Sequence, residues 1–342
     1  MSTMTNTDST GNGSALSDSA RTEAGRARGL RLSGMNWLVW RQHRAAYWTL
    51  LAATLITVAV IVYQRQQVIA YLDGYGYPRL KSGWEEKFDR GPLDWAAQML
   101  GLLPVLIGVF LGGPLLAGDL ETGTAKLVNA QSASRVRWLA TKLGMTALVV
   151  VVCTAALAAA YTWWWSPVKS SSYVLEWADP AAFDSSGPVP VALSLLTLVG
   201  GVAIGMLLRR TLLSMVVTLG FAVVVQMVWS HFRMSLGNIV TVTTHNGVGD
   251  NTFPHVPDTA HEMDQSYLTA SGDLVGWGSC AEQTSEKATN ACLDKAQVVG
   301  WSVDYIPMSQ MSSMQWLGSS ILLALTAGIA VFVILWGRKR LV

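Results

Sequence analysis

Charged side chains are scarce in this sequence. Asp, Glu, Lys and Arg make up 13% of its 342 residues, whereas an ordinary soluble domain carries about 25%. The net charge of +2 gives no electrostatic basis for a nucleic-acid partner. Hydrophobic residues reach 51%, and tryptophans number 15. This composition disfavours a soluble enzyme and indicates a membrane protein.

The sequence also lacks the short motifs of common chemistries. It has no GxxxxGK[ST] loop for nucleotide phosphates, no GxSxG turn and no GxGxxG motif between a strand and a helix. The run HEMD, which begins at His261, lacks the second histidine of a HExxH zinc site. We read it, with His245 and His255, as surface histidines. We therefore expect no catalytic, cofactor or metal site, and no enzymatic activity in this chain.

Long apolar runs dominate the rest of the chain. A bilayer core of about 30 Å needs about 20 apolar helical residues. Six segments meet this requirement: residues 45–63, 95–117, 143–165, 189–208, 212–229 and 314–336. Tryptophans mark many of their ends, as in an aromatic belt. The predicted fold class is an all-α integral membrane protein with six transmembrane helices.

The chain before the first span divides into two parts. Residues 1–34 are rich in Ser, Thr, Gly and Ala, so we predict a disordered cytoplasmic tail. Residues 35–44 read MNWLVWRQHR, with tryptophans and arginines that suit a membrane interface. We predict a short interfacial helix there.

The positions of Lys and Arg predict the orientation. Arg209 and Arg210 occupy a very short connection between two spans, and such basic turns stay in the cytoplasm. The basic segment 118–142 and the basic end of 314–342 then also lie inside. Both termini are therefore predicted to be cytoplasmic, with spans one to five in residues 45–229, in a bacterial plasma membrane.

The same topology places residues 230–313 outside, as an acidic extracellular loop or domain. Cys280 and Cys292 lie in this polar stretch, twelve positions apart. Because the outer face is oxidising and the pair is isolated, we predict a disulfide between them. Cys153 lies in an apolar run and is expected to be a small packing residue.

Ionisable residues are almost absent from the predicted span interiors. Asp94 and Asp119 fall at span boundaries, and Gln226 is the most polar group at depth. Proton-coupled carriers and channels with charged rings need such residues within their spans. This pattern argues against both, and it favours an energy source outside the chain.

Residues 118–142, GDLETGTAKLVNAQSASRVRWLATK, form the only long inside connection. Span two is predicted to continue to Glu121, with a break permitted by Gly123. A helix after Thr124 and another from about Arg135 into span three would complete the segment, with Ser132 or Ser134 as the second cap. On charge alone, residues 118–142 are equally well interpreted as an ordinary solvated loop that obeys the positive-inside rule.

This segment resembles the cytoplasmic loop of type-2 ABC transporter permeases. The likeness rests on D-L-E-T-G-T-A-K-L followed by Q-S-A-S-R-V-R-W-L-A-T-K. The matching residues are Glu121, Gly123, Thr124, Leu127, Ser134, Arg135 and Lys142. The stretches WLVWRQHR and YIPMSQMSSMQW also resemble small actinobacterial permeases of this family. The outer loop is longer than in many small bacterial relatives and is closer to the disulfide-bearing loop of the eukaryotic G subfamily.

The resemblance implies a role for each region. The 118–142 loop would be a coupling helix that docks on an ABC ATPase subunit through Glu121, Gly123, Thr124, Arg135 and Arg137. Permeases of this family pair with a second copy or a related permease, and the pathway lies between spans two and five. By this resemblance, Phe110 or Gln226 would face the pathway.

The expected function is the membrane subunit of an ABC exporter, surrounded by membrane lipid and driven by a separate ATPase. An apolar pathway favours a hydrophobic or amphipathic substrate, such as an antibiotic, lipopeptide or lipid. The alternative is a non-transport membrane sensor or assembly module with a disulfide-stapled outer domain. A neighbouring gene for an ATPase with Walker motifs would favour the exporter. A membrane-embedded enzyme is disfavoured, because no polar cluster converges at one depth.

Overall fold

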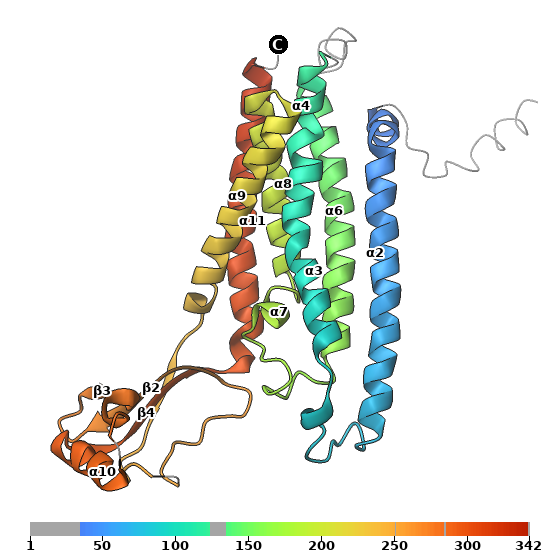
Figure 1. Cartoon of the computed structure of the whole chain (residues 1–342). Helices are drawn as coiled ribbons and strands as arrows, with labels where there is room; N and C mark the ends of the chain where they lie inside the picture. The colour runs from blue at the N-terminus through green and yellow to red at the C-terminus, as the bar shows by residue number, and fades with distance from the viewer. Residues whose placement is uncertain (1–34, 124–134, 250, 284, 341–342) are drawn as a thin grey trace, which may run out of the picture.

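The computed structural model describes residues 35–123, 135–249, 251–283 and 285–340. In this part of the chain, six helical stretches are long and apolar enough to cross a membrane. They are Asn36–Asp73, Gly91–Glu121, Val136–Trp165, Val189–Leu208, Thr211–Phe232 and Met308–Lys339. Figure 1 shows them side by side as one bundle, with a separate small domain at one end. The six predicted spans correspond to these six stretches.

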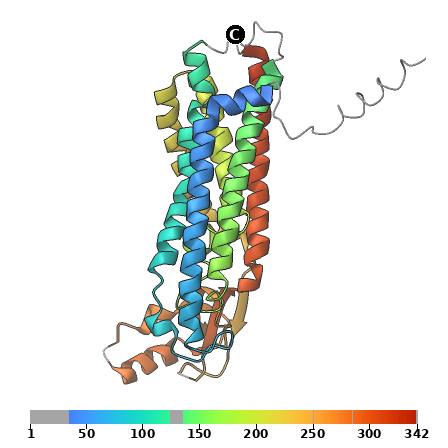
Figure 2. The same cartoon turned by 90° about the vertical axis from the view of Figure 1, so that its right-hand side faces the viewer.

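Helix α2, Met35–Asp73, includes both the predicted interfacial helix and span one. Its first turns lie across the axis of the remainder, as Figure 2 shows at the top of the blue helix. The helix continues ten residues beyond the predicted end of span one at Tyr63. It packs mainly against α6, Arg135–Trp165, and most of its length faces outward.

Span two consists of three consecutive helical segments: α3 (Gly91–Ile107), the π-helical turn η2 (Gly108–Gly112) and α4 (Gly113–Glu121). Pro104 lies within α3 and cannot donate a backbone hydrogen bond. Side chains from other spans bond nearby carbonyls: Thr197 Oγ1 donates to Pro104 O (2.6 Å), and Gln226 Nε2 donates to Gly101 O (2.7 Å). Such bonds let a broken helix remain stable inside a membrane.

Helix α8, Val189–Leu208, is the central span, and it contacts α3, η2, α4, α6, α9 and α11. It ends at Arg209, whose backbone is left-handed (φ 54°). After Arg210, the chain returns as α9, Thr211–Phe232. The short helix α7, Pro180–Phe183, precedes α8, and α11, Met311–Arg340, closes the bundle. Gln315 of α11 donates to Phe183 O (2.8 Å), which ties α11 to α7.

The segment between α9 and α11 forms a small domain. Its antiparallel sheet has the order β1-β4-β2-β3, built from Val240–Thr243, Val298–Ile306, His261–Thr269 and Leu274–Gly276. The prediction of an all-α protein is therefore wrong for this segment. Strands with alternating burial and cross-strand aromatic pairs, such as Tyr267 beside Trp301 (4.7 Å between ring centroids), stabilise the sheet.

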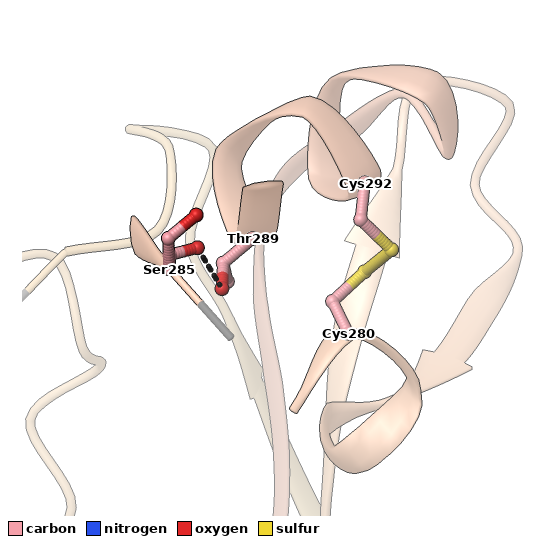
Figure 3. Close-up of a disulfide and its surroundings, with 4 residues drawn as sticks. All are labelled: Cys280, Ser285, Thr289 and Cys292. Carbon is pink, nitrogen blue, oxygen red and sulfur yellow. Dashed lines mark hydrogen bonds between the residues drawn. A yellow bond between two sulfur atoms is a disulfide. The ribbon is translucent and has the colours of Figure 1, made fainter. Parts of the chain in front are cut away.

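The predicted disulfide between Cys280 and Cys292 is present in this domain. It joins the turn η4, Trp277–Cys280, to the helix α10, Glu286–Lys295 (Figure 3). Ser285 caps α10: its side chain accepts from Ala288 N, and its carbonyl accepts from Thr289 Oγ1 (3.2 Å), the contact drawn in Figure 3.

Further short turns connect these elements: η1 (Glu85–Lys87), η3 (Met234–Leu236) and η5 (Met308–Gln310).

The small sheet domain contacts the segment before α7 through hydrogen bonds. Trp177 Nε1 donates to Thr259 O (2.8 Å), and Ser172 Oγ donates to Asp258 O (2.7 Å). The start of α2, the end of α4 and the end of α11 lie together at the opposite end of the bundle (Figure 1).

Candidate functional site: the α4–α6 connection and a cavity at the far end

The predicted coupling residues lie around the connection between α4 and α6. Glu121 is the last residue of α4, and its Oε2 accepts hydrogen bonds from Thr211 N (2.8 Å) and Thr211 Oγ1 (2.7 Å). Thr211 is the first residue of α9, whose amide groups lack partners within the helix. Glu121 therefore caps α9 from a neighbouring helix, and a movement of α4 would reach α9 through this contact.

The rest of the predicted segment is described in part. Gly123 has a left-handed backbone (φ 73°), which places the turn where the sequence predicted a break. Thr124 lies outside the described residues. Helix α6 begins at Arg135, the predicted start, and Arg137 is exposed in its first turn.

A buried ion pair lies where α4 and α6 approach each other. Lys142 Nζ bonds Asp119 Oδ2; Lys142 is fully buried, and Asp119 is 8% exposed. Gln42 Nε2 of α2 donates to the other carboxylate oxygen, Asp119 Oδ1 (2.9 Å). The Lys142 ammonium also lies 5.4 Å from the ring centroid of Trp138. These contacts join α2, α4 and α6, so we call Gln42, Asp119 and Lys142 the polar clamp.

The polar clamp corrects one expectation. Lys142 was assigned to the inside connection, and Asp119 to a span boundary, so the span interiors were expected to have almost no ionisable groups. The first turns of α6, before the predicted span at residue 143, already pack against α2 and α4, and this places Lys142 inside the bundle. Removing one charge of such a pair leaves the other buried without compensation.

A second polar contact lies one turn further along α2 and α6. Tyr47 and Thr146 share a hydrogen bond of 2.7 Å between their hydroxyl oxygens, and both residues are fully buried. Together with the polar clamp, this bond fixes the start of α2 against the start of α6. The helix ends that flank the 122–134 connection are therefore bonded to each other and to α2.

The opposite end of the bundle contains a cavity of about 530 Å³ between α3, α7, α8 and α9. Charged and polar side chains make up part of its lining: Arg90, Asp94, Asp179, Asp184, Gln98, Gln226, Ser185 and Ser230. The volume falls within the range of small-molecule sites.

Two carboxylates of this cavity, Asp94 and Asp184, form ion pairs. Arg90 Nε donates to Asp94 Oδ2 (2.8 Å). Asp184 accepts from Trp229 Nε1 (2.7 Å) and from Arg233 Nη1 (3.3 Å). Burial raises the pKa of the Asp184 carboxyl, and the charge of Arg233 opposes that rise. The C-terminal end of α9 is thus held to the segment that follows α7 by a partly buried carboxylate.

The structure separates the two predicted pathway residues. Gln226 lines the cavity through its position on α9. Phe110 lies in the π-helical turn η2, is 62% exposed, and is not among the residues that line this cavity. The structure therefore gives Gln226 a concave environment and leaves Phe110 on the outer face of the bundle.

Sequence reasoning missed the polar clamp and the Asp184–Arg233 pair. A weak signal existed for the clamp, since Asp119 and Lys142 each adjoin a long apolar run. No local pattern connects Asp184 to Arg233, 49 positions apart. In the described ranges, no group of three or more His, Cys, Asp or Glu side chains is placed to hold a metal ion.

The fold defines a class: a multi-pass helical membrane protein with a small disulfide-bonded domain. The family described as ABC-2 membrane transporter related matches residues 47–233, which is more than half of the chain. The chain therefore belongs to the ABC-2 membrane transporter related family. No curated protein matches it, and no solved structure matches it.

Proposed function

We propose that this chain is the membrane subunit of an ABC exporter, and that a separate ATPase drives it. Members of the ABC-2 permease family form the membrane part of transporters and work with an ABC ATPase. The observation that carries the proposal is the family match over residues 47–233, which includes both helices that flank the α4–α6 connection.

The contact with the ATPase is assigned to residues 118–142. Glu121, Gly123, Thr124, Arg135 and Arg137 form or flank this contact in our proposal. The polar clamp and the Glu121–Thr211 bonds support it, because they connect this end of the bundle to α2 and to α9. A push on the connection would then move several helices together.

The orientation follows from the basic residues. Residues 1–34, the 118–142 segment, Arg209 and Arg210 would lie in the bacterial cytoplasm. The sheet domain, within residues 230–313, would lie outside. Residues 35–44 would rest at the inner membrane surface, and the likeness to small actinobacterial permeases belongs to this same proposal.

The pathway is proposed to lie at the contact between two permease copies, or between this chain and a related permease. Gln226 would line the pathway at the cavity, and Phe110 would face the partner copy from its exposed position on η2. The mostly apolar bundle favours a hydrophobic or amphipathic substrate, such as an antibiotic, lipopeptide or lipid.

Co-purification tests the ATPase contact. The chain would be expressed with the ATPase subunit encoded beside it, and the amount of ATPase retained per permease would be measured. We expect Arg137→Glu and Glu121→Arg to reduce retention at least tenfold. Lys295→Glu, on α10 at the other end of the molecule, is the matched control. Equal retention by all three variants, at equal membrane levels, would refute the assignment.

One observation favours the second candidate, a sensor or assembly module. The sheet domain has its own disulfide and packs on the bundle through Trp177 and Ser172, so it forms an ordered surface for a partner. A chain of this kind would function without hydrolysis of ATP by any partner. Transport that stops when the ATPase carries an inactivated Walker motif would exclude this candidate.

A further inference from the structure

A groove runs along the outer halves of α6, α8 and α11. It has a volume of about 960 Å³ and shares no lining residue with the cavity between α3 and α9. Its deeper part is lined by small and apolar side chains of three helices, including Ala155, Val191 and Leu323. Its other end reaches the turn η5 and the first residues after α6.

Small residues on α6 keep the groove open. Ala155 and Ala159 are one turn apart, and both are exposed along its floor. A large side chain at Ala159 would occupy the space between α6 and α11. On α11, Ser312 and Trp316 are also one turn apart and form the opposite wall.

The mouth of the groove is polar and positively charged. Lys169 and Ser166 line it from the end of α6, and Ser312 lines it from α11. Trp163 and Trp316, 45% and 61% exposed, lie on the two sides. Exposed tryptophans near the ends of spanning helices mark the headgroup level of a bilayer.

A second cation adjoins the mouth. The Arg65 guanidinium of α2 lies 3.9 Å from the ring centroid of Trp163, and its Nε donates to Trp163 O (3.1 Å). Neither Arg65 nor Lys169 belongs to an ion pair with a described residue, and no acidic side chain lines the groove. The mouth therefore carries positive charge that the protein itself leaves uncompensated among its described residues.

We propose that this groove is a specific site for one anionic phospholipid, with an acyl chain along Ala155 and Ala159 and the phosphate at Lys169. An acyl chain matches the apolar floor, and a phosphate at headgroup level matches the cations and serines at the mouth. A peptide segment would leave backbone groups unpaired against the alanines of the floor. The site is separate from the proposed pathway and does not depend on it.

Native mass spectrometry of the full-length protein tests the proposal. Detergent-purified protein would be titrated with phosphatidylglycerol or with phosphatidylcholine of the same acyl chains. We expect one tightly retained phosphatidylglycerol. Lys169→Gln should weaken its binding about fivefold, because one surface cation contributes about that much to anionic lipid binding. Binding of phosphatidylcholine should not change.

Two controls separate this site from general lipid contact. Lys81→Gln removes an exposed lysine that does not line the groove, and it should leave binding unchanged. Ala159→Trp should abolish retention of the lipid, whereas Ala156→Trp, three positions earlier on α6 at a residue that does not line the groove, should not. If Ala159→Trp fails to fold, the comparison of Lys169→Gln with Lys81→Gln still tests whether phosphatidylglycerol binds at this groove.

A photo-crosslinkable phosphatidylglycerol locates the bound molecule. We expect crosslinked peptides from the second half of α6 and the first half of α11. Crosslinks confined to other helices would overturn the proposal. Equal weakening by Lys169→Gln and Lys81→Gln, or equal retention of the two lipids, would overturn it as well.

Discussion

Helices α8 and α9 are neighbours in sequence and almost equally hydrophobic, with mean hydropathies of 2.4 and 2.2, yet they occupy opposite environments. In α8, 72% of the apolar window is buried by protein, whereas in α9 only 17% is buried. In a membrane, lipid is as apolar as a protein core, so hydropathy alone does not distinguish a central span from a peripheral one.

The two helices are also held by different means. Helix α8 is held by close packing of glycines: a Cβ on Gly201 would lie 2.8 Å from Gly108 O and 2.9 Å from Gly113 N. Helix α9 packs along one side on α8, η2 and α4, and polar contacts add to this near its ends, Glu121 to Thr211 at one end and Asp184 to Trp229 and Arg233 at the other. The first arrangement fixes the core, and the second leaves one face of α9 available.

The attachment at the C-terminal end of α9 should be the most sensitive point. Arg233→Met leaves the Asp184 carboxylate buried without its cation, and we expect a loss of about 3–5 kcal/mol in the free energy of unfolding. Reversible unfolding in detergent micelles would measure the loss. Asp184→Asn combined with Arg233→Met should recover most of it, because neither charge remains. A double variant as unstable as Arg233→Met alone would contradict this account.

The pH dependence of Arg233→Met sharpens the same test. Burial raises the pKa of Asp184, so the folded state holds its proton at a pH where the unfolded chain has released it. The contribution of the Asp184 carboxyl to stability therefore falls as the pH rises from its pKa in the unfolded chain to its pKa in the folded state. Without Arg233 the pKa rises further, so the variant should lose less stability at acidic pH than at neutral pH. A loss that does not vary with pH would count against a charged Asp184.

Packing around α8 should give the next largest effect. Gly201→Leu forces side-chain atoms against the backbone of η2 and α4, and we expect a loss of about 2 kcal/mol. Gly220→Leu on α9 is the matched control, because a Cβ there meets nothing within 4 Å. Thermal unfolding of both variants would measure the contrast. Equal destabilisation would show that α9 is packed as tightly as α8.

The contact at the middle of α9 should contribute less. Gln226→Leu removes the donor to Gly101 O near the proline of α3, and hydrogen bonds between membrane helices contribute about 1 kcal/mol or less. Unfolding measurements would test this. Gln226→Glu is a useful companion, since it keeps the size and removes the amide donor; stability equal to the native protein would refute a structural role for this bond.

The cap at the N-terminal end of α9 should produce the smallest and most local change. Glu121→Ala removes the acceptor for Thr211 N, so the first turn of α9 should open more often while the bundle stays folded. Hydrogen exchange at residues 211–214 would rise, with no change around α8. Glu121→Gln keeps an acceptor oxygen and should preserve protection. Unchanged exchange in Glu121→Ala would mean that another group caps the helix.

Several features were predictable because they depend on local sequence. Hydropathy over about 20 residues located all six spanning stretches, and the isolated pair Cys280 and Cys292 was assigned correctly to a disulfide. The end of α4 at Glu121 and the start of α6 at Arg135 followed from turn and capping residues. Predicted helix ends were less accurate where packing sets the boundary: span one was predicted to end at Tyr63, but α2 continues to Asp73.

Other features depend on contacts between distant residues. Lys142 was assigned to the end of the inside segment 118–142, where the chain enters span three, and no partner was predicted for it. Its partner, Asp119, is 23 positions away, and only the approach of α4 to α6 brings the two charges together. The four-stranded sheet was missed for a similar reason, since its central pair joins β2 to β4 across the intervening α10.

The sequence by itself determined that the chain has six stretches long and apolar enough to cross a membrane, and that its long basic connection follows the second of them. Those properties depend on composition and on the order of residues along the chain. The tertiary structure decided that α8 is central, that Asp119 and Lys142 form a buried pair and that α9 is held near its ends. The physical reason is that hydropathy is a sum over neighbours in sequence, whereas packing and ion pairing depend on distances between helices.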